Sequence, residues 1–170
     1  MALRHIRLED DPILRKTSKE VKEITPAVIT LLDDLAETMH SADGVGFAAP
    51  QVGILKRICV VDIEEENGLV ELINPEVLEE SGEQNEKEGC LSVPGVVGSV
   101  VRAMNVKVKA INRNGEPFEL NGEGYLARAL LHEIDHLNGI IFTDKAIIER
   151  ETEEQRKERR RNERRKARNK

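Results

Sequence analysis

Aromatic residues are scarce in this 170-residue chain, which has no Trp, one Tyr and three Phe. Proteins that bind single-stranded nucleic acid stack the bases on aromatic side chains, and this chain offers little material for such a surface. Basic residues are also outnumbered by acidic residues outside the C-terminal end. Residues 155–170 hold ten Lys or Arg and two Glu, so residues 1–154 carry −14 within the total net charge of −6. A nonenzymatic RNA-binding protein is therefore disfavoured.

Cysteine and long apolar runs are equally limited. Cys59 and Cys90 are the only cysteines, too few for a disulfide framework in a chain of this length, so both are expected as thiols. No apolar run approaches the ~20 residues that a membrane-spanning helix needs. The first residues, MALRHIRLEDDP, lack the apolar segment of a secretory signal. These absences predict a cytoplasmic protein that does not enter a membrane.

The length and composition suit one globular domain, with 39% apolar and 34% charged residues. We expect that domain to occupy residues 1–150, and a charged, basic tail to occupy residues 151–170. The final stretch, QRKERRRNERRKARNK, has one apolar residue, Ala167, and so has no face that could dock on a hydrophobic core. The tail is predicted as a solvated helix or a disordered arm.

Two helices are predicted in the body. Thr25 can cap a helix that Pro26 opens, and the apolar residues that follow recur at helical spacing. Those residues are Val28, Leu31, Leu32, Leu35 and Met39. A second helical pattern runs from about Glu123 to Leu137, and Gly139 is placed to end it.

The middle of the body has strand patterns. The runs at 57–63 and 69–73 are joined through Asn67 and Gly68, which predicts a hairpin. Cys59 lies in the first of these runs and is expected as a buried strand residue. Residues 104–111 alternate apolar and polar side chains before a turn at Asn-Gly, which predicts a second hairpin.

The segment LLHEIDHLNG, within the second predicted helix, holds His132, Glu133 and His136. Residues four apart project from the same face of a helix, so the two imidazoles can bind one cation. Tyr125 and Ala129 share that face, and Glu133 borders an apolar stripe. Burial raises the pKa of a carboxylate, which suits a general base near neutral pH, although a nearby cation lowers it.

Two histidines do not complete a metal site. A metzincin-type site needs a third His where this chain has Phe142, and a thermolysin-type site needs a downstream Glu, for which only Glu158 and Glu163 in the basic tail are placed. A zinc endopeptidase therefore lacks a credible third ligand. Cys90, in the loop EGCLSVPG, would give three ligands and leave a fourth position open, as in catalytic sites. By chemistry alone, Cys90 and some other ligand remain equal alternatives.

Three segments together resemble the peptide deformylase family. GVGFAAPQ (44–51), EGCLS (88–92) and HEIDH (132–136) are similar to its three motifs, in the family's order and spacing. The resemblance implies an α+β fold in which antiparallel β-sheets surround a central metal-binding helix. The basic C-terminal tail lies outside the resemblance.

The resemblance also implies a reaction: removal of the formyl group from the N-terminal formylmethionine of newly synthesised polypeptides, with release of formate. It implies that Cys90, His132 and His136 bind one divalent metal ion, Fe²⁺, which Zn²⁺, Ni²⁺ or Co²⁺ can replace. Metal-bound water would attack the formyl carbonyl, with Glu133 as general base and acid.

The remaining implied roles concern the substrate. The Gln51 amide and the Leu91 backbone N–H would stabilise the oxyanion. The residues expected to bind the peptide are Gly46, through its backbone, and Val45, Tyr125 and Ala129, as walls of a methionine pocket.

Other interactions stay open at this stage. Glu88 and Arg102 would either form an ion pair near the metal loop or leave Arg102 as a solvated charge. The basic tail would contact ribosomal RNA through its phosphates or remain solvated. The partners expected are formylmethionyl nascent peptides and, through the tail, the ribosome, and the protein is expected as a monomer.

Overall fold

The computed structural model describes residues 2–150 and 153–169, without the side chains of 148–150. In chain order the elements are η1 (Pro12–Arg15), α1 (Pro26–Ser41), β1 (Gly46–Ala48), η2 (Ala49–Val52), β2 (Ile58–Val61), β3 (Val70–Ser81), β4 (Gln84–Cys90), β5 (Val93–Arg102), β6 (Asn105–Ile111), β7 (Pro117–Glu123), α2 (Tyr125–Leu137), η3 (Phe142–Asp144), β8 (Ile147–Arg150) and α3 (Glu153–Arg168). The fold is α+β, as predicted.

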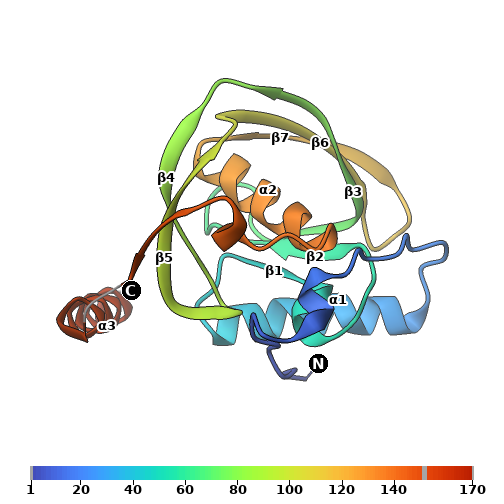
Figure 1. Cartoon of the computed structure of the whole chain (residues 1–170). Helices are drawn as coiled ribbons and strands as arrows, with labels where there is room; N and C mark the ends of the chain where they lie inside the picture. The colour runs from blue at the N-terminus through green and yellow to red at the C-terminus, as the bar shows by residue number, and fades with distance from the viewer. Residues whose placement is uncertain (1, 151–152, 170) are drawn as a thin grey trace.

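Two antiparallel sheets surround helix α2. One sheet has the strand order β1-β2-β3-β6-β7 and the other the order β4-β5-β8. Figure 1 shows α2 enclosed between these strands, with α1 on the opposite side of β1 and β2. Eleven of the 13 residues of α2 are buried, so this helix is a core element that contacts neighbours on nearly every face.

Both predicted hairpins are present. β2 pairs with β3 in an antiparallel register that sets Val61 opposite Val70, and β6 pairs with β7 with Ile111 opposite Pro117. β3 extends beyond the predicted run, to Ser81. Sequence patterns did not identify β1, β4, β5 or β8. β4, QNEKEGC, is mostly polar, so its extended conformation depends on pairing with β5 rather than on its own composition.

The ends of α1 and α2 follow local chemistry. The Thr25 hydroxyl accepts from the Val28 N–H, and Pro26 occupies the first turn of α1. Gly139 follows α2 with φ of 74°, a left-handed conformation that favours glycine. A Cβ there would lie 2.6 Å from the Arg15 carbonyl oxygen, so close packing also requires glycine. Arg57 donates to the Leu137 carbonyl at 3.0 Å and satisfies one of the last acceptors of α2.

Asp34 attaches the N-terminal segment to α1. Its side chain is buried, and its carboxylate accepts from the Ala2 N–H at 2.7 Å and from Arg4 Nε at 2.9 Å. Burial acts to raise the pKa of Asp34, but these two donors outweigh it and hold the pKa below its usual value. Asp34 is therefore ionised in the folded protein at neutral pH.

Replacing Asp34 with Asn should lower the free energy of unfolding by about 1–3 kcal/mol near neutral pH. A depressed folded-state pKa stabilises the protein above the unfolded pKa of about 3.9, and this stability is lost as pH falls through the folded pKa. In urea unfolding, the difference between the two proteins should shrink as the pH is lowered from about 6 toward about 3. Asp33→Asn, at a partly exposed neighbour, should cost less than about 1 kcal/mol. A difference that does not vary with pH would contradict this assignment.

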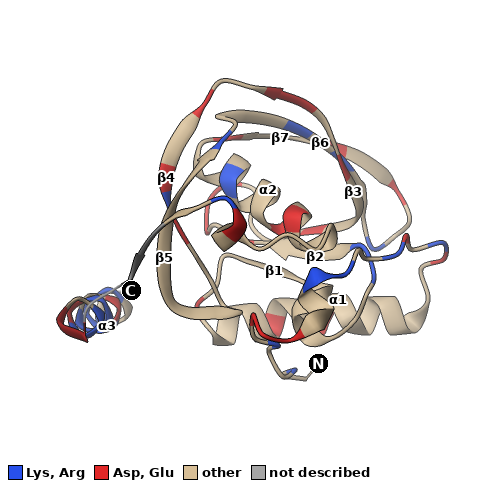
Figure 2. Ribbon diagram, in the orientation of Figure 1, with Lys and Arg blue, Asp and Glu red and all other residues tan. Residues whose placement is uncertain are grey.

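The C-terminal tail forms helix α3, which has no buried residue among those described. Arg159 and Glu163, four residues apart, form an ion pair at 3.1 Å on its surface. Figure 2 shows basic and acidic residues along α3, which lies beside the body beyond β5. Among the described residues, no helix is long and apolar enough to cross a membrane.

Candidate metal centre and active site

Three side chains that can bind a metal converge between β4 and α2. Cys90 ends β4, whereas His132 and His136 lie one turn apart on α2. One ligand atom from each lies within 4.8 Å of the others, and Cys90 Sγ is 3.4 Å from His136 Nε2. The fold thus brings the Cys90 thiol next to two imidazoles that lie more than 40 residues further along the chain.

This donor set fits a divalent ion. A thiolate with two imidazoles is a ligand set of catalytic zinc sites and suits other first-row metals. His132 Nδ1 bonds to the Glu88 carboxylate at 2.8 Å, which leaves Nε2 of that ring free to bind a metal. His136 Nδ1 is buried and has no hydrogen-bond partner among the described residues.

The two rings differ in protonation when no ion is bound. Burial lowers the pKa of both imidazoles, but the contacts of His132 with Cys90 and Glu88 outweigh it and raise its pKa to about 10. Burial, followed by the charge on His132, places the pKa of His136 well below its usual range. Metal binding requires neutral imidazoles and a thiolate, so an ion would replace the proton on His132.

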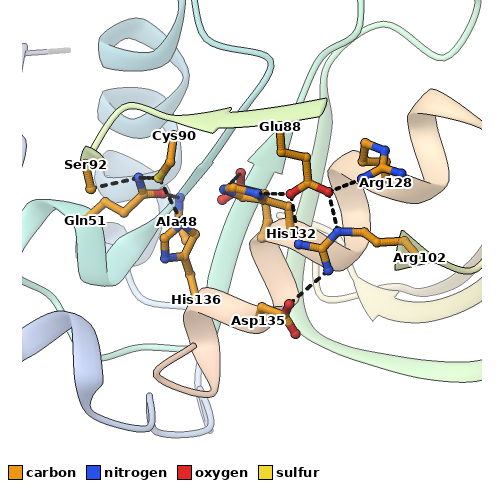
Figure 3. A network of polar contacts seen from close by, with 11 residues as sticks. Ala48, Gln51, Glu88, Cys90, Ser92, Arg102, Arg128, His132, Asp135 and His136 are labelled. Atoms are coloured by element: carbon orange, nitrogen blue, oxygen red, sulfur yellow. Dashed lines mark hydrogen bonds and ion pairs between the residues drawn. The ribbon is translucent and has the colours of Figure 1, made fainter. Parts of the chain in front are cut away.

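Glu88 is the centre of a buried ionic network behind His132 (Figure 3). Arg102 donates to both of its oxygens, at 2.5 and 2.9 Å, and also donates to Asp135 at 2.9 Å. Arg128 donates to Glu88 as well. Burial acts to raise the pKa of Glu88, but His132 and Arg102 lower it to about 2. Arg102, whose role the sequence left open, is therefore a buried ion-pair partner and not a solvated charge.

Glu133 lies beside the ligand cluster and is only 3% exposed. Its Oε1 is 3.9 Å from His132 Nε2, and its Oε2 has no hydrogen-bond partner among the described residues. Burial raises the pKa of Glu133 to about 7. A carboxylate of this pKa can accept and return a proton near neutral pH.

The Gln51 amide is held in one orientation by three contacts. Its Oε1 accepts from the Ala48 N–H at 2.9 Å, while its Nε2 donates to Ser92 Oγ at 3.0 Å and approaches Cys90 Sγ at 3.6 Å (Figure 3). The first contact assigns the oxygen and nitrogen positions, so an N–H donor faces the metal ligands. Gln51 is 1% exposed, and its positioning partners Ser92 and Ala48 were not identified from the sequence.

The predicted site residues border one cavity of about 570 Å³, except His136, which is not part of its lining. The residues predicted from the sequence that border it are Val45, Gly46, Gln51, Cys90, Leu91, Tyr125, Ala129, His132 and Glu133. Arg128 also borders this cavity and was not identified from the sequence. Its position between Tyr125 and His132 at helical spacing was the available signal.

A buried helix that presents two imidazoles and a carboxylate beside a thiol, at the edge of a cavity, has the construction of a mononuclear metallohydrolase site. Comparison with known proteins agrees with this class. The family model described as polypeptide deformylase matches residues 3–152. The chain belongs to the polypeptide deformylase family, whose members are metal-dependent enzymes that act on formylated nascent peptides.

Individual relatives support the assignment over most of the chain. The peptide deformylase of Alkaliphilus metalliredigens is 58% identical over 149 residues, which cover 88% of this chain and 100% of the relative. The crystal structure of a peptide deformylase from Legionella pneumophila has 44% identity and a TM-score of 0.82, covering 94% of this chain and 92% of that one. The crystal structure of the peptide deformylase from Ehrlichia chaffeensis in complex with actinonin has 39% identity and a TM-score of 0.83, and the match covers 85% of this chain and 89% of that one.

Proposed function

We propose that this chain removes the formyl group from the N-terminal formylmethionine of newly synthesised polypeptides in the cytoplasm. The observation that carries the proposal is the convergence of Cys90, His132 and His136 within 4.8 Å, beside the buried carboxylate of Glu133. Cys90, His132 and Glu133 border one cavity together with the oriented Gln51 amide. The reaction breaks the formyl C–N bond, forms a C–O bond with water and yields formate and a free amine.

Cys90, His132 and His136 would hold one divalent ion, which we propose to be Fe²⁺, with Zn²⁺, Ni²⁺ or Co²⁺ as replacements. When bound, the ion supplies a Lewis acid that acidifies water and polarises the formyl carbonyl. Glu88 positions His132 through the 2.8 Å bond to Nδ1, and the contacts with His132 and Arg102 hold the pKa of Glu88 low enough to keep that carboxylate ionised. Metal analysis of protein purified without oxygen tests the identity of the ion.

Glu133 would move the proton during the reaction. Its carboxylate accepts a proton from the attacking water and returns it to the leaving amine. The Gln51 Nε2 amide and the Leu91 backbone N–H donate to the oxygen of the formyl group as negative charge develops there. The Ala48 N–H keeps the Gln51 amide from rotating, so the donor is in place before the substrate binds.

The rest of the cavity would bind the peptide. The Gly46 backbone is proposed to pair with the formylated peptide, and Val45, Tyr125 and Ala129 to form walls of the methionine pocket. All four residues border the cavity. Ala129 is buried and Tyr125 is 53% exposed, which is consistent with a deep apolar wall and a wall at the mouth.

The proposal is tested by measuring formate release from a short formyl-Met peptide with Fe²⁺-loaded protein prepared without oxygen. Release that depends on metal would support deformylation. Cys90→Ala should lose both the bound metal and the activity, because only two of the three proposed ligands, the imidazoles of His132 and His136, remain. A folded, metal-loaded protein that cleaves internal peptide bonds and releases no formate would instead indicate a zinc-type endopeptidase.

We propose that residues 1–150 form the deformylase domain, that the protein is a monomer, and that residues 151–170 are a tail that contacts ribosomal RNA. The described part of the tail is a helix with no buried residue and an excess of basic side chains. Such a helix can contact phosphates along its length. The attraction weakens as the salt concentration rises, because the release of counterions from the RNA then contributes less free energy to binding. The contact would place the enzyme where formylated chains emerge.

Deleting residues 155–170 should weaken ribosome binding, with the largest loss at low salt, while formate release from a formyl-Met dipeptide is retained. Short substrates should be spared because the metal ligands, Glu133 and Gln51 all lie in the body, although Arg159 and Glu163 of α3 also border the cavity. The matched variant keeps the full length and replaces Arg160, Arg161, Arg164 and Arg165 by Gln, so that charge alone changes. Ribosome affinity that is equal in all three proteins, in co-sedimentation over a salt series, would exclude the contact.

A further inference from the structure

Helix α3 of the C-terminal tail forms part of the wall of the cavity that contains the candidate active site. Arg159 and Glu163 border this cavity together with Lys87 of β4. Arg156, one turn before Arg159, lies against β5, because a Cβ added to Gly95 would be 3.4 Å from its Nη2. The family model ends at residue 152, so this part of the wall belongs to the chain's own tail.

One face of α3 is turned toward the body. Arg156, Arg159 and Glu163 are spaced by three and four residues, so they project from the same side of the helix. Arg159 is the only described residue of α3 that is partly buried. Lys157 is exposed and projects about 200° away from Arg159. The face that borders the cavity therefore differs from the face left for the proposed contact with ribosomal RNA.

The side of the cavity formed by α3, β4 and β5 has an excess of positive charge. Lys87, Arg156 and Arg159 are basic, whereas Glu163 is acidic and pairs with Arg159 at 3.1 Å. Asp43, a further charged residue of the lining, belongs to the segment between α1 and β1. Guanidinium groups form strong, charge-assisted hydrogen bonds with carboxylates, so an acidic side chain is the group that this side would favour.

A formylated polypeptide would pass this side of the cavity. Its first residue is proposed to lie against Val45, Tyr125 and Ala129, and the residues that follow must leave through the cavity mouth, where Tyr125 is 53% exposed. An extended peptide advances about 3.3 Å per residue. The residues directly after methionine therefore come within reach of a long side chain that borders the same cavity, such as that of Arg159.

We propose that Arg159 is a specificity-determining residue that binds an acidic side chain at position 2, 3 or 4 of the formylated peptide. This inference rests on the proposed deformylase function. Glu163 holds the Arg159 guanidinium beside the cavity and competes with the substrate carboxylate for it. Lys87 and Arg156 strengthen the attraction of the same side for negative charge.

The test uses formyl-Met-Ala-Ala-Ala-Ala with an amidated C-terminus, in which position 2, 3 or 4 is replaced by Glu or by its neutral analogue Gln. kcat/KM for formate release is measured with the full-length, metal-loaded protein and with Arg159→Gln, Glu163→Gln and Lys157→Gln. The last variant is the control, because it removes one positive charge from the opposite face of α3. The ratio of the Glu peptide to the Gln peptide is compared at each position.

At the position that reaches Arg159, the unaltered protein should prefer Glu over Gln by about 2- to 5-fold, the range for one exposed ion pair. The ratio should fall toward 1 in Arg159→Gln and rise in Glu163→Gln, which lacks the competing carboxylate. Lys157→Gln should keep it. Added salt should reduce the preference, because it screens exposed charges. Ratios within one preparation do not depend on the fraction of active enzyme, so partial metal loss cannot imitate the effect.

A ratio of 1 at all three positions in the unaltered protein would overturn the proposal, as would an unchanged ratio in Arg159→Gln. An equal fall in Arg159→Gln and Lys157→Gln would assign the effect to the net charge of the tail and would also overturn it. If the unaltered protein releases formate from none of the peptides, the deformylase proposal itself fails. The two failures are therefore distinguishable in one experiment.

Discussion

Glu133→Gln should lower kcat/KM for formyl-Met peptides by about 10²- to 10⁴-fold, the contribution typical of a general acid and base. Glutamine has nearly the size of glutamate but cannot accept and return the proton. The Glu133 side chain is buried beside His132, and burial raises its pKa to about 7. Because Cys90, His132 and His136 are unchanged, the metal content should remain at one ion per chain.

Three measurements separate this loss from damage to the fold. Metal content, thermal unfolding and formate release are compared for the unaltered protein, Glu133→Gln and Glu37→Gln. Glu37 is an exposed residue of α1, and its replacement should leave all three unchanged. A Glu133→Gln protein that keeps its metal and more than about a tenth of its activity would show that another group moves the proton.

Gly46→Ala should lower kcat/KM by about 10²-fold, because displacing a catalytic group by about 1 Å can have an effect of this size. A Cβ at Gly46 would lie 2.5 Å from Glu133 Oε1 and 2.9 Å from its Cδ. Those distances are too short for non-bonded atoms, so the carboxylate must move. The close approach of β1 to α2 therefore requires glycine at this position.

A double-mutant cycle checks this mechanism. If alanine acts by displacing the Glu133 carboxylate, adding Gly46→Ala to Glu133→Gln should cause little further loss, because the displaced group has already lost its function. Loss of the full factor in both backgrounds would instead assign Gly46 an effect through its backbone, such as pairing with the peptide. Formate release from the four proteins, at equal metal content, decides between these outcomes.

The helices and hairpins that the sequence predicted share one property: their signals are local. Thr25 and Pro26 open α1, the apolar stripe of α1 recurs within a few residues, and Gly139 follows α2 at the left-handed position. The pairing of His132 with His136 is equally local, because one helical turn sets it. The three motifs located the family, and the comparisons confirm it.

Contacts between residues far apart in the chain were harder to predict from the sequence. Chemistry alone left Cys90 and some other residue as alternatives for the third metal ligand. The distance between Cys90 and His136 depends on β4, a polar segment whose extended conformation depends on pairing with β5. The burial of Arg102 likewise depends on β5 and α2 meeting at Glu88. Arg128 was missed, since a charged residue on a helix is usually solvated.

The sequence by itself determined the two helices and the two hairpins, and its resemblance to the family gave the class of fold and the residues proposed to bind metal and substrate. Only the tertiary structure decided that Arg102 and Arg128 are buried against Glu88, that the Gln51 amide is held by Ala48 and Ser92, and that Gly46 touches Glu133. Periodicity, caps and turns act over a few residues, so a linear pattern records them. The position of a donor relative to a carboxylate on another strand depends on how the sheets close around α2, which no local pattern encodes.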